Sequence, residues 1–415
     1  MKIRSITYFD TLRWPLDDVQ IQNAGEFVKN ARGAYQDQGF EVQTTRLASA
    51  PFPYILQAKV ANESVAFAVA LEAQMLRSGF DYASIGPAIP SVKESYKVIP
   101  KVLANTQYIF TAGIISSAEI GIDPGAIKQC AGVITENSVI SADGFGNLRF
   151  AALANVPSGS PFLPAAYHEF GRKPGFAIAT ESADLAVTAF GNVASLDTAR
   201  SGLIKSIEKS AHELEIIGQK LALDYGVQFE GIDFSFAPFP TAEQSIGTAV
   251  EKLGVPGVGN HGSLAAIAIL AAALDQAQFQ KVGFNGVMLP VLEDTVLAGS
   301  ATADMLTVNN LLLYSAVCGT GLDTVPLPGS VSEDQLYAVL LDLAALAQRL
   351  GKPLTARLMP IPGKKAGDTT EFDFEFFANS KIMGLDAQPL FGNLAENNEF
   401  PIKNRNSSSS ARGLV

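Results

Sequence analysis

The fold of this 415-residue chain is decided by two stretches, GVQFEGIDFSFAPFP at residues 226–240 and GVGNHGSLAAIAILAAAL at residues 257–274. The first is rich in Phe and Ile and predicts a buried strand over residues 227–236. The second is a glycine-rich turn that runs into an apolar helix over residues 264–274, with Ser263 as its expected N-cap. A strand, a loop and a helix in succession are the repeating unit of an α/β fold.

The same alternation of strands and helices continues outward in both directions. Strands are predicted at residues 3–9, 40–45, 82–85, 107–113, 175–180, 227–236, 284–290, 322–325 and 355–359. Helices are predicted at residues 19–38, 63–78, 124–137, 194–225, 242–253, 264–274, 293–317 and 333–350. This order favours parallel strands joined by helical crossovers. We expect one domain over residues 1–395 and a loosely held, Ser- and Asn-rich tail over residues 396–415.

The composition argues against several classes of function. The net charge is −11 and the sequence holds no cluster of Lys or Arg, so neither nucleic acid nor an anionic membrane is an expected partner. Cys130 and Cys318 do not form a disulfide framework. The N-terminus does not resemble a signal peptide, and the longest apolar stretch, residues 264–274, is shorter than the roughly 20 residues of a membrane-spanning helix. We therefore expect a cytoplasmic protein and leave a homo-oligomer open.

The glycine-rich turn holds the first candidate for chemistry. The chain has three histidines, and His261 lies directly before the predicted 264–274 helix. A helix N-terminus presents free backbone N–H groups and the positive end of the helix dipole. We expect Asn260, Gly262 and Ser263 to bind a substrate, and His261 to act as an acid, a base or a metal ligand. The alternative is a histidine that only organises the loop.

Further polar side chains fall at the ends of predicted strands. They are Asp233, Glu293, Asp294, Cys318, Asp323 and Arg357. Because α/β folds place ligands at the carboxyl ends of strands, these residues are candidates for one site. The structural alternatives are a turn acceptor for Asp233, a helix-capping pair for Glu293 and Asp294, an inert buried thiol for Cys318 and an ion pair with a structural carboxylate for Arg357.

A second histidine, His168, lies next to Glu169 in a loop-like region. It is either a packed loop residue or a ligand and acid–base group. His168 and Asp233, together with His261, form the predicted metal site. Two histidines with carboxylates suit Zn²⁺, Mn²⁺ or Fe²⁺ by ligand type.

Several short motifs occur in an order that resembles a known family. They are FLPAAYH at residues 162–168, the 226–238 stretch, NHGS at residues 260–263, LED at residues 292–294 and CGTGLD at residues 318–323. The chain resembles, from residue 4 to about residue 392, the uncharacterised bacterial and archaeal family called domain of unknown function 711. That family is often labelled "PFL family", after pyruvate formate-lyase.

This resemblance implies a fold and does not bring a reaction. The implied fold is a ten-stranded β/α barrel made of two five-stranded parallel halves that run antiparallel to each other. The Arg-Val-x-Gly-Tyr radical loop of glycyl radical enzymes is absent, and Cys318 has no adjacent cysteine. We therefore predict that the protein does not use glycyl radical chemistry.

We predict an enzyme that acts on a small, partly anionic metabolite through polar acid–base or metal-assisted chemistry. The predicted catalytic residues are His261, Glu293, Asp294 and Cys318. The predicted substrate-binding residues are Asn260, Gly262, Ser263, Asp323 and Arg357, and the predicted metal ligands are His168 and Asp233, with His261. The alternative is a non-catalytic protein that binds or senses a metabolite on a degenerate barrel.

Overall fold

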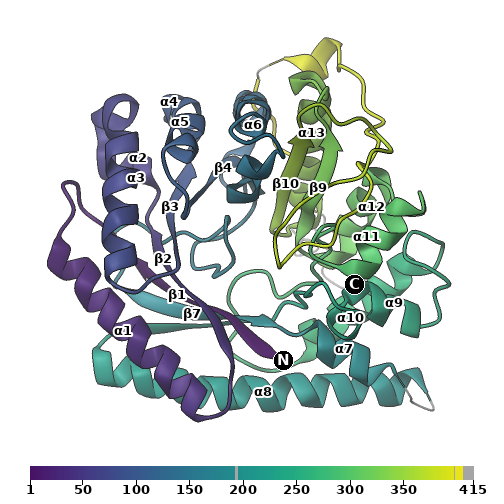
Figure 1. Ribbon diagram of the computed structural model, residues 1–415, viewed down its shortest axis with the longest axis horizontal. Helices are drawn as coiled ribbons and strands as arrows, with labels where there is room; N and C mark the ends of the chain where they lie inside the picture. The colour runs from purple at the N-terminus through teal and green to yellow at the C-terminus, as the bar shows by residue number, and fades with distance from the viewer. Residues whose placement is uncertain (192–194, 397, 405–415) are drawn as a thin grey trace, which may run out of the picture.

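The computed structural model describes residues 1–191, 195–396 and 398–404. The strands of these residues form one sheet in the order β8-β7-β1-β2-β3-β4-β6-β10-β9, and the short β5 pairs with β4 (Figure 1). The strands are β1 (Lys2–Asp10), β2 (Val42–Ser49), β3 (Tyr82–Ala88), β4 (Ile109–Ser117), β5 (Gly121–Ile122), β6 (Phe150–Ala154), β7 (Gly175–Glu181), β8 (Gln228–Asp233), β9 (Gly321–Pro328) and β10 (Leu354–Ile361).

The strand directions divide the sheet into groups. Strands β1, β2, β3, β4 and β6 are parallel to one another. At one side the parallel pair β7 and β8 joins β1 in an antiparallel manner, and at the other side the parallel pair β10 and β9 joins β6 in the same way. A mixed α/β fold is therefore confirmed, with five parallel strands in the first half.

The strand predicted at residues 284–290 is wrong, because residues 280–291 form no regular strand. This segment runs between β8 and β9 and makes isolated parallel bridges to each, at Ile232–Lys281 and at Pro290–Asp323. Asp233 accepts hydrogen bonds from the N–H groups of Phe284 and Asn285, so these N–H groups cannot form the backbone hydrogen bonds of a regular strand. The sheet is not closed by a continuous ladder, and the implied ten-stranded barrel is not shown.

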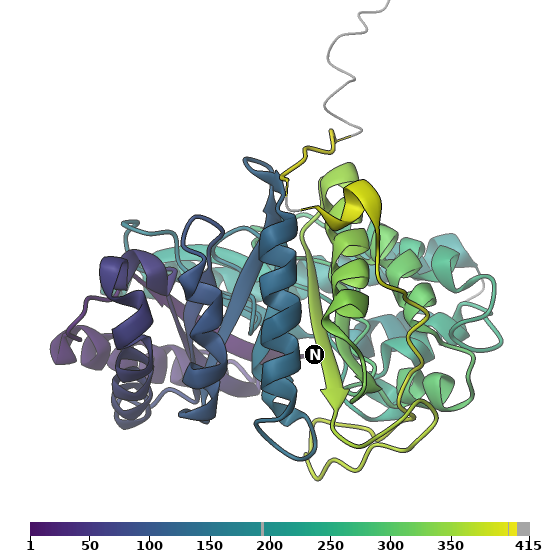
Figure 2. The same cartoon turned by 90° about the horizontal axis from the view of Figure 1, so that it is seen from above.

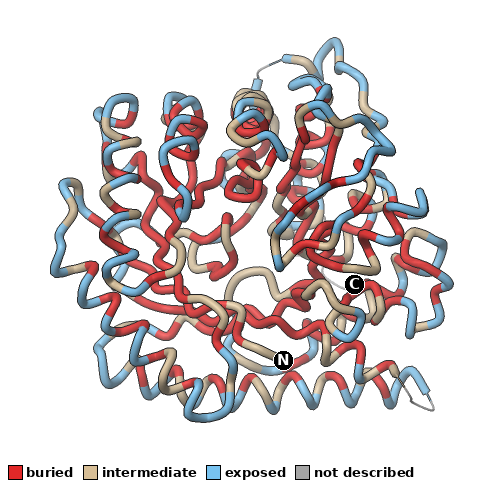
Figure 3. Tube along the Cα trace, viewed as in Figure 1, coloured by how far each residue is buried: buried red, intermediate tan, exposed pale blue. Residues whose placement is uncertain are grey.

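Helices cover the outer face of the curved sheet (Figures 1 and 2). They are α1 (Asp18–Asp37), α2 (Phe52–Leu56), α3 (Val60–Arg77), α4 (Glu94–Lys97), α5 (Ile99–Ala104), α6 (Pro124–Ser138), α7 (Ala183–Ala189), α8 (Leu196–Tyr225), α9 (Ile246–Lys252), α10 (Ser263–Gln276), α11 (Thr295–Thr302), α12 (Val308–Cys318) and α13 (Glu333–Leu350). Figure 3 shows buried strands inside and helices whose outer faces are exposed. This is the burial pattern of a sheet covered by helices.

The inner side of the sheet is filled by the loop between β6 and β7. Small inward residues make room for it: Ala48 on β2, Ala112 on β4 and Ala177 on β7 belong to the two clusters in which the loop is buried. The carbonyl of Pro161 accepts a hydrogen bond of 2.9 Å from the hydroxyl of Thr7 on β1. The loop therefore contacts strands β1, β2, β4, β6 and β7 from within.

The predicted tail lies only partly within the described residues, because residue 397 and residues 405–415 are outside them. Phe400 pairs with Ile122 of β5 through two backbone hydrogen bonds, of 3.1 and 3.2 Å. The side chain of Arg349 on α13 donates a hydrogen bond to the carbonyl of Lys403. The single domain over residues 1–395 stays a prediction. Within the described ranges, the structure contains no helix long and apolar enough to cross a membrane.

Candidate functional site

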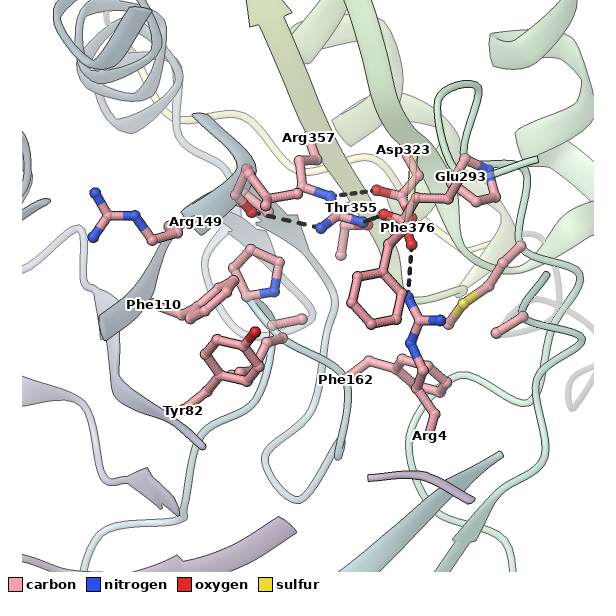
Figure 4. Close-up of a pocket in the computed structure, with 18 of the residues that line it drawn as sticks. Arg4, Tyr82, Phe110, Arg149, Phe162, Glu293, Asp323, Thr355, Arg357 and Phe376 are labelled. Carbon is pink, nitrogen blue, oxygen red and sulfur yellow. Dashed lines mark hydrogen bonds and ion pairs between the residues drawn. The ribbon is translucent and has the colours of Figure 1, made fainter. Parts of the chain in front are cut away.

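A cavity of ≈ 280 Å³ lies at the end of the sheet where β1, β2 and β3 begin (Figure 4). Its charged lining consists of Arg4, Arg46, Arg149, Arg357, Glu293 and Asp323. Its aromatic lining consists of Tyr82, Tyr108, Phe110, Phe145, Phe162, Phe284, Phe374 and Phe376. Residues 162–165 of the inner loop also line the cavity, so the loop closes it on the side of the sheet interior.

A network of ion pairs crosses one wall of the cavity. Glu293 joins two arginines: its Oε2 lies 2.8 Å from Arg4 Nη2, and its Oε1 lies 2.7 Å from Arg357 Nη2. Arg4 also contacts Glu181 at 2.7 Å, and Arg357 Nε contacts Asp323 Oδ1 at 2.6 Å. Burial raises the pKa of the Asp323 carboxyl, an effect that Arg357 opposes and Glu293 reinforces. Each member is paired, as buried charges require.

A bulge in β9 places Asp323 beside Arg357. Two residues of β9, Asp323 and Thr324, lie opposite the single residue Arg357 of β10. Thr324 has φ +39°, a strained conformation for a β-branched residue, and its buried hydroxyl has no hydrogen-bond partner. β-Bulges next to active sites redirect side chains, and strained residues gather at such sites. The strain at Thr324 therefore accompanies a carboxylate directed toward the cavity.

Arg46 differs from the other charged residues of the lining. It comes from the middle of β2, its residue is 8% exposed, and its Nε donates to the hydroxyl of Thr44 at 3.0 Å. Within the part of the chain that the structure describes, it makes no ion pair, whereas Arg4 and Arg357 each make two. Burial and the neighbouring charge of Arg4 lower the pKa of the Arg46 guanidinium to about 9. Tyr82, Glu293 and Asp81 oppose this decrease, and a bound anion would raise the pKa of Arg46 further.

Arg149 also lacks a carboxylate partner among the described residues, but its guanidinium donates hydrogen bonds to backbone carbonyls. Its Nη1 donates to the carbonyl of Thr106 at 2.8 Å, and its Nη2 donates to that of Leu103 at 2.7 Å. The Arg149 guanidinium is therefore satisfied by the chain itself. Arg46 is left as the guanidinium of the lining that is best placed to receive a ligand.

Two pairs of aromatic rings stand on different sides of the cavity. Tyr82 and Phe110, from β3 and β4, pack edge to face with their ring centroids 5.4 Å apart. Phe374 and Phe376, from the segment after β10, pack with centroids 5.2 Å apart. The Arg4 guanidinium lies over the Phe376 ring, 5.3 Å from its centroid. Figure 4 shows Tyr82 and Phe110 across the cavity from Phe376.

The structure brings together three of the predicted site residues. Glu293, Asp323 and Arg357 all line the cavity and are bonded to one another through Arg357. Their proximity agrees with the prediction, but Asp323 and Arg357 lie in the first halves of β9 and β10, not at the carboxyl ends of strands where a site was expected.

The capping alternative is confirmed for Asp294 and not for Glu293. Asp294 is fully buried and is the N-cap of α11, where its Oδ1 accepts the N–H of Val296 at 2.9 Å. Its Oδ2 accepts the N–H of Ile246 at the start of α9. Asp294 thus holds two helix N-termini and does not line the cavity, while the preceding Glu293 does.

The glycine-rich turn lies outside the cavity lining. His261, Asn260 and Gly262 are exposed at the surface. The expected N-cap is corrected: Gly262, with φ +105°, occupies the cap position, and α10 begins at Ser263. The Ser263 hydroxyl instead accepts the N–H of Gly259 at 3.1 Å and closes the turn. The turn is local, so its sequence could not reveal where the fold places it.

Cys318 and the predicted metal ligands are placed in separate surroundings. Cys318, fully buried at the end of α12, receives the N–H of Thr320 at 3.5 Å, which agrees with an inert thiol. His168 is buried, and its Nε2 lies 3.2 Å from the carbonyl of Arg172. His168, Asp233 and His261 are not brought together. In the described ranges, no three His, Cys, Asp or Glu side chains form a group that could hold a metal ion.

Asp233 is a turn acceptor that ties residues 280–291 to β8. Its carboxylate accepts the N–H groups of Ser235, Phe284 and Asn285, the last two at 2.7 and 3.0 Å, and the Ser235 hydroxyl at 2.6 Å. Burial raises the pKa of Asp233 to about 6, although these hydrogen bonds oppose the rise.

We expect Asp233→Ala to lower the free energy of unfolding by about 2–3 kcal/mol at pH 7, because it orphans several buried donors. Since the folded pKa exceeds the unfolded value, the carboxyl adds stability below about pH 4 and loses it as the pH rises through 6. The difference between the wild type and the variant should therefore widen on acidification from pH 7 to 4, as measured by urea unfolding. A constant difference would contradict the raised pKa.

We expect His261→Ala to change the free energy of unfolding by less than about 0.5 kcal/mol, because the side chain is exposed and has little packing to lose. Ligand binding in the cavity should be unchanged, since His261 is not part of the lining. Thermal unfolding and calorimetric titration measure the two quantities. A loss of ligand binding without destabilisation would instead show that His261 takes part in binding.

The site also contains residues that the sequence prediction missed. Arg46 and Tyr82 lie within or at the start of strands, and Arg4 lies near the start of β1. The strand predicted at residues 40–45 ends before Arg46, whereas β2 extends to Ser49. A longer strand would have revealed a charged residue in the middle of a buried element, which is a signal of function.

Comparison with known proteins identifies the family of the chain and names no reaction. The family model described as "Uncharacterised ACR (DUF711)" matches residues 1–380. The chain belongs to this family. The resemblance noted from the motifs is thereby confirmed.

Relatives in this family occur in archaea and bacteria. A UPF0210 protein of Pyrobaculum arsenaticum is 31% identical over 346 residues, which cover 80% of this chain and 76% of the relative. A UPF0210 protein of Lactobacillus delbrueckii subsp. bulgaricus is 28% identical, with 84% of this chain and 80% of the relative covered. One from Clostridium perfringens is 27% identical, with 85% and 81% covered. These names describe no reaction.

Proposed function

We propose that the cavity binds a small anionic metabolite whose acidic group lies against Arg46. The observation that carries this proposal is a buried guanidinium in the cavity lining that makes no ion pair among the described residues. A buried charge is costly unless it is paired, and a carboxylate or phosphate is the natural partner of a guanidinium. A bound anion would supply the partner that the chain itself does not.

The charge balance of the lining supports the same proposal. Four arginines and two carboxylates line the cavity among the described residues, although the whole chain has a net charge of −11. A positive cavity in an acidic protein attracts anions and selects against cations. Because the ion pairs of Glu293 neutralise Arg4 and Arg357 in part, the excess positive charge is concentrated at Arg46 and Arg149.

We further propose that the protein is an enzyme in which Asp323 exchanges a proton with the bound metabolite. The bulge directs this carboxylate to the cavity, and burial raises its pKa above the ordinary value of an Asp carboxyl, although Arg357 opposes the rise. Arg357 would hold the carboxylate in place and stabilise its charged form. The second candidate, a binding or sensing protein without chemistry, needs Arg46 but not the strained bulge at Thr324.

We also infer that residues 280–291 complete a barrel around the inner loop, as in the fold that the family resemblance implies. The N–H of Val287 donates to the carbonyl of Cys318, and the N–H of Ile232 donates to that of Gln280, each at 2.8 Å. These bonds support a segment that joins β8 to β9 without forming a regular strand.

Calorimetric titration with charged ligands and their neutral analogues tests the proposed anion site. Acetate is compared with acetamide, and phosphate is compared with glycerol, at low ionic strength and pH 7. We expect saturable binding of at least one anion and none of the neutral compounds, with weaker binding as salt is added. Failure of every anion to bind would contradict the proposal, as would equal binding of acetate and acetamide.

A further inference from the structure

The cavity combines its positive charge with an aromatic lining, and the combination defines a class of ligand. We infer that the metabolite carries a planar aromatic ring next to its acidic group, so that it is an aryl or arylalkyl carboxylate or phosphate. This inference rests on the proposed anion site at Arg46 and adds to it the nature of the rest of the ligand.

The segment at residues 371–377 provides one aromatic wall through its alternating sequence. Phe372 and Phe377 are buried in a core cluster with Leu148, Leu292, Met359, Ile361 and Ile382, against which Phe374 also packs. Phe374 and Phe376, in contrast, are half-buried and line the cavity. Large apolar side chains that remain partly uncovered at a cavity mark a surface that a ligand can cover.

The opposite wall places an aromatic ring beside the anion site. Tyr82 on β3 is the register partner of Arg46 on β2, so the two side chains lie next to each other on the same face of the sheet. Tyr82 packs on Phe110, which lines the cavity next to it. An acidic group at Arg46 would therefore have ring surface directly beside it. Phe376 lies across the cavity from Tyr82 and Phe110 (Figure 4), so a ligand held at Arg46 could contact aromatic rings on both sides.

The size of the cavity fits this class. A dry apolar cavity of about 150 Å³ accepts benzene. The cavity here is ≈ 280 Å³, which leaves room for one ring, a short linker and an acidic group, and excludes large polycyclic ligands. Offset or edge-on ring contacts favour a flat ligand over a saturated ring of equal size, by about two- to tenfold for each contact.

Matched ligands measure the contribution of the aromatic ring to affinity separately from that of the charge. Phenylacetate is compared with cyclohexylacetate, acetate and benzyl alcohol, and phenyl phosphate is compared with methyl phosphate, by calorimetric titration. We expect phenylacetate to bind at least about tenfold more tightly than acetate and several-fold more tightly than cyclohexylacetate, and benzyl alcohol not to bind measurably. The preference between phenylacetate and phenyl phosphate identifies which acidic group the site accepts.

Variants test the walls directly. Phe376→Leu should reduce the preference for phenylacetate over cyclohexylacetate to within about twofold while acetate binding is retained, and Phe110→Leu should do the same from the opposite wall. Phe170→Leu is the matched control, because Phe170 is 52% exposed and outside the cavity lining. Equal binding of phenylacetate and acetate would overturn the aromatic inference and leave the anion site standing. Failure of all the anions would overturn the proposed function itself.

Discussion

Arg46→Met is expected to weaken binding of the anionic ligand by about 30-fold or more. Removal of one partner from a buried, hydrogen-bonded charge pair costs roughly 2–5 kcal/mol, mostly through faster dissociation. In the empty protein the same change should raise the free energy of unfolding by about 1 kcal/mol, because it removes a buried charge that has no ion-pair partner among the described residues. Calorimetric titration and urea unfolding of the one variant measure both effects.

The opposite signs of these two effects make the prediction specific. Replacing a residue with a purely structural role would lower the free energy of unfolding. Replacing a residue that only contacts the ligand would leave the free energy of unfolding unchanged. Arg46→Lys should fall between wild type and Arg46→Met in affinity, because the ammonium keeps the charge and loses the planar, bidentate geometry. Unchanged affinity in Arg46→Met would exclude Arg46 as the anion-binding residue.

Local sequence signals predicted those elements whose boundaries are set locally. The helix predicted at residues 333–350 has the bounds of α13, Glu333–Leu350. Ser332 and Gln335 form a capping box at its start, and Gly351 ends it with φ +65°. By contrast, the strand predicted at residues 284–290 fails because Asp233, some 50 residues earlier in the chain, takes the N–H groups that a strand needs.

The candidate site shows the same division between local and distant causes. Glu293, Asp323 and Arg357 were singled out from the sequence as charged residues in or after predicted strands, but Asp323 and Arg357 lie in the first halves of β9 and β10 and not at the carboxyl ends that the prediction assumed. His261 carried the strongest local motif, but the glycine-rich turn lies outside the cavity lining. Arg46 had no motif at all. A longer predicted strand would have marked Arg46 as a charged residue in a buried element, but the absence of an ion-pair partner among the described residues became visible only in the structure.

The ion-pair network predicts the largest loss of stability, at Glu293. Glu293→Gln is expected to lower the free energy of unfolding by about 3–5 kcal/mol, the cost of removing one partner from a buried ion pair. The Glu293 side chain is 10% exposed and pairs with both Arg4 and Arg357, so its loss leaves the half-buried Arg4 with Glu181 and the buried Arg357 with Asp323 as single carboxylate partners among the described residues. Urea unfolding at pH 7 measures the change.

Asp304→Asn is the matched control for this change. Its partner Lys381 lies 2.8 Å away, but the Asp304 side chain is 80% exposed, and surface pairs contribute less than about 1 kcal/mol. Added sulfate should raise the free energy of unfolding of Glu293→Gln more than that of the wild type, because an anion can take the place of the lost carboxylate between Arg4 and Arg357. If Glu293→Gln were no less stable than Asp304→Asn, Glu293 could not be the residue that positions the arginines of the cavity. Arg4 and Arg357 would then be held by Glu181 and Asp323.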